Sequence, residues 1–296
     1  MLVVISGGSQ GLGLSIAKEY VKRGDDVAIV ARTESKLIAA VDELELLRPS
    51  PTPEDQKIFY IAADVSDAKE CIRVFGSIGS IPDMVYCCAG AALPGLFLRL
   101  TTDELHNSMK TVYDTALYFS HAALKVMSSA PDKQSRRRHL VYCSSTVAVF
   151  PFIGYSAYAP GKAAIRALSD VVRQECLDHN IRVSHVLPGT MATAGYVVEE
   201  QTKPAITKKI EGPSPPATPD SCAKHIIYHL DKGSDTVYTD TIGWVLGSSM
   251  LGTSPRYGTG FLQTLMGIIF AIIGPIVSWS IQRDIVNFEE PSANNN

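Results

Sequence analysis

The stretch Ser6-Gly7-Gly8-Ser9-Gln10-Gly11-Leu12-Gly13 follows the short apolar run 2–5 in a chain of 296 residues. The run is typical of a buried parallel strand, and apolar residues recur at helical spacing after the glycines. In that context Gly7 allows a tight turn, Gly11 lets the backbone approach a pyrophosphate, and Gly13 permits close packing of helix on strand. An ordinary tight turn is the alternative. The predicted dinucleotide site is lined by Gly7, Ser9, Gln10, Gly11, Leu12 and Gly13.

Strand-like runs alternate with helical patterns along most of the chain. Regular alternation favours parallel strands joined by right-handed helical crossovers. We therefore predict one α/β domain over residues 1–250, a doubly wound parallel sheet or Rossmann fold. Strands are expected at 2–6, 27–31, 57–63, 84–88, 139–143, 181–187 and 241–246, and the longest helices at 102–129 and 158–179, with a shorter one at 221–230.

The end of the second predicted strand indicates the form of the cofactor. NAD sites place an acidic residue there to hold the ribose 2′-hydroxyl. Here Arg32 closes the strand and Lys36 lies one turn further on. A guanidinium fits a 2′-phosphate, so NADPH is predicted, although Arg32 could instead be a solvated charge. Asp64, followed by Val65, ends the third strand, where a carboxylate could meet the adenine amino group.

A phenol and an ammonium lie four residues apart at Tyr158 and Lys162. On a helix they would share one face, and a neighbouring cation would bring a phenol with a pKa of about 10 closer to neutral pH. The spacing is weak evidence alone, because surface helices contain it by chance. Ser144 and Ser145 end the strand at 139–143, upstream of the tyrosine.

Taken together, these motifs resemble the short-chain dehydrogenase/reductase family in order and spacing over about residues 1–250. The resemblance implies that Tyr158 protonates a substrate carbonyl as hydride arrives from the nicotinamide. It also implies that Lys162 holds the nicotinamide ribose and that Ser145, with Ser144 as a close contender, hydrogen-bonds the carbonyl oxygen. A homo-oligomer, dimer or tetramer, is implied too. Cofactor contacts are expected from Ala89, Gly90, Tyr158, Lys162, Pro188, Gly189 and Thr190.

Two positions depart from the family pattern. No asparagine precedes Ala89-Gly90, and Val112 stands where the family places a catalytic asparagine. The proton relay that the family builds behind the lysine is therefore not expected in its usual form. Pro160-Gly161 predicts that the helix carrying Lys162 begins only around Tyr158.

Two further segments follow the predicted catalytic residues in the sequence. Residues 190–219 are rich in proline and follow a strand end, so we predict a mobile substrate lid; a plain surface connection is the alternative. The 21 residues from Phe261 to Ile281 hold no formal charge, and about 30 Å of helix would cross a bilayer. We predict a membrane-associating segment at 256–284, spanning or re-entrant, before a polar tail at 285–296. A buried or oligomer-forming helix is the alternative.

The composition limits which ligands and binding partners are expected. The net charge of −3 gives no reason to expect nucleic acid, and the six cysteines show no metal-ligand spacing, so no metal is predicted. The cysteines are expected to be reduced, in a domain facing the cytosol. Within the family, the chain resembles members that reduce a long-chain lipid ketone with NADPH at the endoplasmic reticulum membrane. Rival hypotheses are a membrane-bound enzyme acting on a steroid, retinoid or 3-oxoacyl substrate, and a non-catalytic NADP-binding scaffold.

Overall fold

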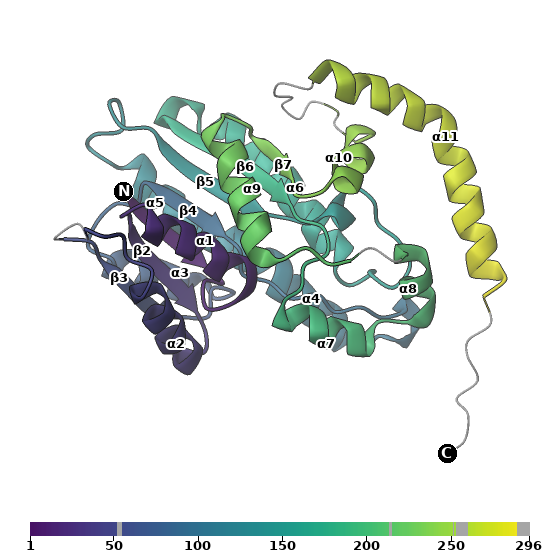
Figure 1. The fold of residues 1–296 in the computed structure, drawn as a ribbon, viewed down its shortest axis with the longest axis horizontal. Coiled ribbons are helices and arrows are strands. Elements are labelled where there is room, and N and C mark those ends of the chain that lie inside the picture. The colour runs from purple at the N-terminus through teal and green to yellow at the C-terminus, as the bar shows by residue number, and fades with distance from the viewer. Residues whose placement is uncertain (52–54, 213–214, 251, 253–259, 289–296) are drawn as a thin grey trace.

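A computed structural model describes residues 1–51, 55–212, 215–250, 252 and 260–288. Its centre is a sheet of seven parallel strands in the order β3-β2-β1-β4-β5-β6-β7 (Figure 1). The predicted doubly wound α/β architecture is confirmed. The strands are β1 (Leu2–Ser6), β2 (Asp26–Ala31), β3 (Ile58–Ala62), β4 (Met84–Cys87), β5 (Arg138–Cys143), β6 (Ile181–Leu187) and β7 (Thr236–Tyr238).

Helices cover both faces of the sheet, and each layer buries its own apolar cluster. One cluster joins Ile16 and Ile226 to the sheet, and the other joins Phe75 and Phe119 to the opposite face. The helices that pack on the sheet are α1 (Gly11–Lys22), α2 (Glu34–Glu45) and α9 (Pro219–Asp231) on the first face, and α3 (Ala68–Ser77), α5 (Thr115–Ser128) and α6 (Ala159–Glu175) on the second. Helix α4 (Thr102–Met109) and a π-helical turn (Lys110–Asp114) lead into α5.

Strand order reverses between β1 and β4, and the glycine stretch turns at this point. Gly7 has φ of +71°, and a Cβ there would lie 2.9 Å from the backbone of Ala89 in the loop after β4. A Cβ on Gly13 would lie 2.4 Å from the carbonyl oxygen of Gly7. The glycines therefore let α1 begin directly on the end of β1, where open α/β sheets bind ligands.

The prediction of a last strand at 241–246 is wrong. These residues form helix α10 (Thr241–Ser248), and the last strand, β7, ends three residues before the helix begins. Asp240 caps the helix, since its carboxylate accepts a hydrogen bond from the N–H of Gly243. The short run around Val237 pairs with β6 and forms the last strand of the sheet. The apolar residues 241–246 therefore do not pair with the sheet, although their sequence alone suggests a strand.

The predicted lid contains two helices, α7 (Ala194–Thr202) and α8 (Ala205–Glu211). Its two ends are joined, because Ala192 donates to the carbonyl of Ala217 and Ala217 donates to the carbonyl of Thr190. The segment is thus an ordered excursion from the sheet edge and not an irregular connection. Residues 213–214 of the predicted lid lie outside the described residues.

Helix α11 (Gly260–Val286) contains the apolar segment predicted at 261–281. Among the described helices it alone is long and apolar enough to cross a membrane, with a mean hydropathy of 2.0. Its pattern is inverted relative to a soluble helix, because Gln263 is its one buried residue while Ile272 and Trp279 are exposed. The helix bends along its length and lies beside α8 and α10 (Figure 1). Residues 256–259 and 289–296 of the two predicted C-terminal segments lie outside the described residues.

Candidate active site

The N-terminus of α1 forms a cradle suited to phosphate. Gln10 precedes the helix without a side-chain cap, and the first turn holds no acidic residue. The backbone N–H groups of that turn are thus left for a ligand, and the helix dipole favours an anion there. A Cβ on Gly11 would lie 3.4 Å from Thr193, so the start of the lid lies directly over the cradle.

The two basic residues after β2 lie beside this cradle. The ammonium of Lys36 donates to the side-chain oxygen of Gln10 at 3.0 Å, which joins the start of α2 to the glycine loop. Burial opposes ionisation of Asp64, but hydrogen bonds from Ser66 and the charge of Arg32 hold the pKa of its carboxyl below the usual value. The predicted cofactor residues from β1, β2 and β3 therefore come together, and a dinucleotide with a charged ribose end fits this donor set.

Tyr158 immediately precedes α6, as the sequence predicts. Pro160 occupies the first turn, where its missing N–H is no loss, and the N–H of Lys162 donates to the carbonyl of Tyr158. Burial and the charge of Glu199 raise the pKa of the Tyr158 phenol, while a hydrogen bond with Ser145 acts against them. The expected lowering of this pKa by Lys162 is not observed, because burial prevails in the structure. The phenol is therefore protonated at neutral pH and suited to act as an acid.

Lys162 points from α6 towards the ends of β4 and β5. Its ammonium is buried, lies 5.6 Å from the ring centroid of Tyr158, and donates to the carbonyl of Cys143 at 2.9 Å. Burial lowers its pKa. A Cβ on Gly90 would lie 3.7 Å from the ammonium, so the predicted Ala89-Gly90 loop meets the lysine.

The two candidate serines have different partners. The hydroxyl of Ser144 donates to the carbonyl of Lys162 at 2.8 Å and is buried, which fastens α6 to the end of β5. Ser145 accepts a hydrogen bond from the N–H of Val147 and contacts the phenol of Tyr158. Of the two, Ser145 is therefore the one placed to meet a carbonyl oxygen.

The two positions that depart from the family pattern have separate surroundings. Val112 is fully buried in the π-helical turn, and a Cβ on Gly161 would lie 2.9 Å from its side chain. Gly161 thus makes room for an apolar residue where a polar relay is usual. At the other position Cys87 is buried at the end of β4, and the thiol of the next residue, Cys88, lies 2.9 Å from that of Cys143. All six cysteines are free.

The residues after β6 hold the lid. The N–H of Gly189 donates to the hydroxyl of Thr239, and the carbonyl of Pro188 accepts from the N–H of Thr146. Thr190 donates to the carboxylate of Glu211 on α8 at 3.0 Å. These predicted cofactor residues therefore lie between the sheet and the lid, and the hydroxyl of Thr190 already has a partner in the lid.

A cluster that sequence reasoning missed lies between the lid and Tyr158. The ammonium of Lys203 is buried and lies 2.5–3.3 Å from carboxylate oxygens of Glu199, Glu200 and Glu211. Burial disfavours the charge, but these hydrogen bonds raise the pKa of Lys203 above its usual value. Tyr155 donates to Glu199, so the cluster reaches the segment that carries Tyr158. Glu199 and Glu200 lie within one helical turn of Lys203, whereas only the fold brings Glu211 of α8 to it.

A parallel sheet with a glycine cradle, next to a half-buried tyrosine and serine and a buried lysine, defines an oxidoreductase of the Rossmann class. Residues 1–203 match the family described as short chain dehydrogenase. The chain belongs to this family. Solved structures share the fold: levodione reductase has a TM-score of 0.69 at 19% identity, covering 81% of this chain and 95% of that one. The closed form of serine dehydrogenase complexed with NADP+ has a TM-score of 0.68 at 18% sequence identity, covering 87% of this chain and 98% of that one.

Closer relatives match almost the whole chain. The 3-ketodihydrosphingosine reductase TSC10 of Debaryomyces hansenii is 40% identical over 296 residues, covering 97% of this chain and 89% of the relative. The reductase of the same name from Yarrowia lipolytica is 39% identical, covering 96% and 76%. That of Saccharomyces cerevisiae is 34% identical, covering 95% and 94%.

The Lys203 cluster predicts a large loss of stability when its cation is removed. Lys203→Met leaves three carboxylates facing one another, and breaking a buried ion pair from one side costs about 3–5 kcal/mol. Urea denaturation measures the free energy of unfolding. Lys208→Met is the matched control, because Lys208 pairs with Glu200 while 45% exposed, and such pairs contribute about 1 kcal/mol or less. Equal losses in the two variants would show that the cluster does not hold the lid.

Proposed function

We propose that this protein reduces the ketone of 3-ketodihydrosphingosine to the alcohol, using NADPH. The observation that carries the proposal is the near full-length match to reductases of that name, together with an intact Ser145, Tyr158 and Lys162 arrangement. Members of the family use NAD or NADP, and Arg32 and Lys36 beside the cradle favour the 2′-phosphate of NADPH.

The residues of the chain divide the work of reduction. Bound NADPH supplies the hydride. Ser145 and Tyr158 hold the carbonyl oxygen, and the Tyr158 phenol donates a proton to it as negative charge develops there. Lys162 stands behind the phenol, where its ammonium would hold the nicotinamide ribose. Gly11 and the first turn of α1 would hold the pyrophosphate.

The setting of this site favours a substrate drawn from a membrane. Helix α11 presents its apolar residues outward, which suits insertion in a bilayer, spanning or re-entrant. The Arg283 guanidinium lies 5.2 Å from the Trp279 ring, a pairing suited to the membrane–water interface. We infer an endoplasmic reticulum location with the catalytic domain in the cytosol, a homo-oligomeric assembly, and a lid formed by residues 190–219.

The assay that tests the function is reduction of detergent-dispersed 3-ketodihydrosphingosine with NADPH. Tyr158→Phe removes the acid, so kcat/KM is expected to fall by roughly 10²–10⁴-fold while NADPH still binds. Because the pKa of the phenol is raised, activity of the parent should hold through neutral pH and fall only on the alkaline side. Tyr228→Phe, an exposed tyrosine on α9, should behave as the parent.

Two results would count against this function. Absence of turnover by the parent would leave the rival lipid substrates to be tested. Full activity of Tyr158→Phe would exclude the acid role, and a Tyr158→Phe protein that still supports sphingolipid synthesis in cells would favour the non-catalytic scaffold.

The cofactor preference has its own test. Arg32→Ala should raise KM for NADPH by about 10- to 100-fold and leave KM for NADH nearly unchanged, because hydrogen bonds to charged groups contribute about 1.5–3 kcal/mol. Arg23→Ala is the control for loss of one positive charge, since Arg23 lies at the opposite end of α1 and pairs with Asp231. Equal use of NADH and NADPH by the parent would contradict the assignment.

The membrane role of α11 is tested by flotation with liposomes. Asp at both Ile272 and Ile276 should release the protein, since a charge near the bilayer centre costs roughly 2.5–3.5 kcal/mol per residue. Both isoleucines are exposed in α11, so packing within the protein is kept. The same change at Ile38 and Ile72, exposed on α2 and α3, should have no effect. Continued flotation of the α11 variant would place the anchor elsewhere.

A further inference from the structure

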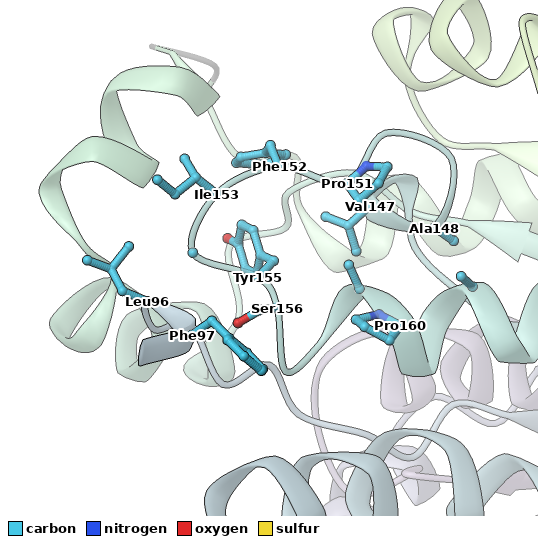
Figure 2. A pocket seen from close by; sticks show the side chains of 13 residues that line it. Leu96, Phe97, Val147, Ala148, Pro151, Phe152, Ile153, Tyr155, Ser156 and Pro160 are labelled. Atoms are coloured by element: carbon cyan, nitrogen blue, oxygen red, sulfur yellow. The ribbon is translucent and has the colours of Figure 1, made fainter. Parts of the chain in front are cut away.

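An apolar cavity of about 390 Å³ opens beside the start of α6 (Figure 2). Its volume lies within the roughly 300–1,000 Å³ typical of small-molecule sites. The walls come from the loop after β4, the loop between β5 and α6, and the first turns of α6. Figure 2 shows the Tyr155 ring and Ser156 in the middle of this lining, among Leu96, Phe97, Phe152 and Pro160.

The lining is suited to hydrocarbon. Its polar side chains are Tyr155 and Ser156. The Tyr155 hydroxyl donates to Glu199 of the lid, so its ring is left to form a wall of the cavity. Phe152 packs edge-on against that ring at 5.1 Å between centroids. An alkyl chain gains free energy by burying its surface against such a lining, whereas a polar ligand would find few hydrogen-bond partners.

The cavity lies one ring away from the reacting centre. The centroids of Tyr155 and Tyr158 are 6.0 Å apart, and Val147 of the lining is two residues beyond Ser145. On α6 the cavity-lining residues immediately follow the catalytic ones, with Ala163 turned about 100° from Lys162. A chain attached to a carbonyl at Tyr158 would therefore pass the Tyr155 ring to enter the cavity.

The other side of the cavity leads towards the apolar helix α11. A Cβ on Gly154, which lines the cavity, would collide with Thr207 of α8, so α8 packs directly behind the lining. Helix α8 in turn contacts α11, and the Lys209 ammonium lies 5.8 Å from the Phe288 ring. Phe97 at the cavity is itself 61% exposed. One helix thus separates the cavity from the segment proposed to enter the bilayer.

We propose that this cavity binds the alkyl chain of the ketone substrate, and that the small side chain of Ala163 keeps it open. The proposal rests on the proposed function for the identity of the ketone. It predicts that chain length is sensed here, because each methylene that leaves water contributes roughly fourfold to binding.

The test compares the long-chain ketone with an analogue whose alkyl chain is cut to a few carbons. Ala163→Trp should lower the long-to-short ratio of kcat/KM by about tenfold or more, since lost contact with two methylenes alone costs roughly sixteenfold. Ala163→Leu should lower it less, and serves if the tryptophan variant does not fold. Ala167→Trp is the matched control, because Ala167 is exposed one turn further along α6 and does not line the cavity.

A direct binding measurement makes the two proposals separable. A long-chain alkylamine carrying a dansyl group should bind the parent and the Ala167→Trp variant alike, and bind the Ala163→Trp variant at least tenfold more weakly. An unchanged ratio and unchanged probe binding in both Ala163 variants would overturn the cavity assignment, as would a changed oligomeric state with unchanged binding. A parent that binds the probe but reduces neither ketone would instead overturn the proposed function and leave the cavity assignment standing.

Discussion

Two buried hydrogen bonds between β5 and α6 position the whole reacting centre. Ser144 donates to the carbonyl of Lys162 at 2.8 Å, and the ammonium of Lys162 donates to the carbonyl of Cys143 at 2.9 Å. Leaving either buried group unpaired would cost about 1–3 kcal/mol, so the start of α6 has one favourable position on the sheet. That position sets Tyr158 against Ser145 and sets Lys162 beside the Ala89-Gly90 loop.

The same packing explains why the site tolerates its two unusual residues. The Val112 side chain carries no exchangeable proton, so a proton relay through that side chain is excluded. The contact of Val112 with Gly161 instead brings the π-helical turn against α6 without a polar group that would need a buried partner. In place of the usual asparagine, Cys87 is buried in the sheet, and the thiol of the neighbouring Cys88 meets that of Cys143. The reacting centre is therefore supported by apolar contacts at position 112, where the resemblance to the family predicts a polar relay.

Most of the sheet was predictable because strands such as β1, β2 and β4 are largely continuous apolar runs, and because the glycine stretch follows a strand end. The apolar run at 241–246 was wrongly predicted as a strand, because a short apolar run is compatible with either a buried strand or a short helix. The feature that indicates a helix here is Asp240, which caps its first turn. Candidate site residues were predictable where they follow strands. The raised pKa of Tyr158 and the Lys203 cluster were not, because the first depends on burial and on the charge of Glu199, and the second on Glu211, which only the fold brings to Lys203.

The segment proposed as the lid therefore also acts on Tyr158. Burial is the main cause that raises the pKa of the Tyr158 phenol, and the charge of Glu199 adds to it. Glu199 also accepts a hydrogen bond from Tyr155, while Lys203 balances its charge. Tyr155 is at once a wall of the apolar cavity and the contact between that wall and the lid. An alkyl chain that packs against Tyr155 would thus meet a ring that is hydrogen-bonded to Glu199. The same carboxylate raises the pKa of the Tyr158 phenol. Because α8 also touches α11, the segments proposed as anchor and lid, the cavity and Tyr158 form one continuous set of contacts, and a substrate that came from a bilayer would meet them in that order.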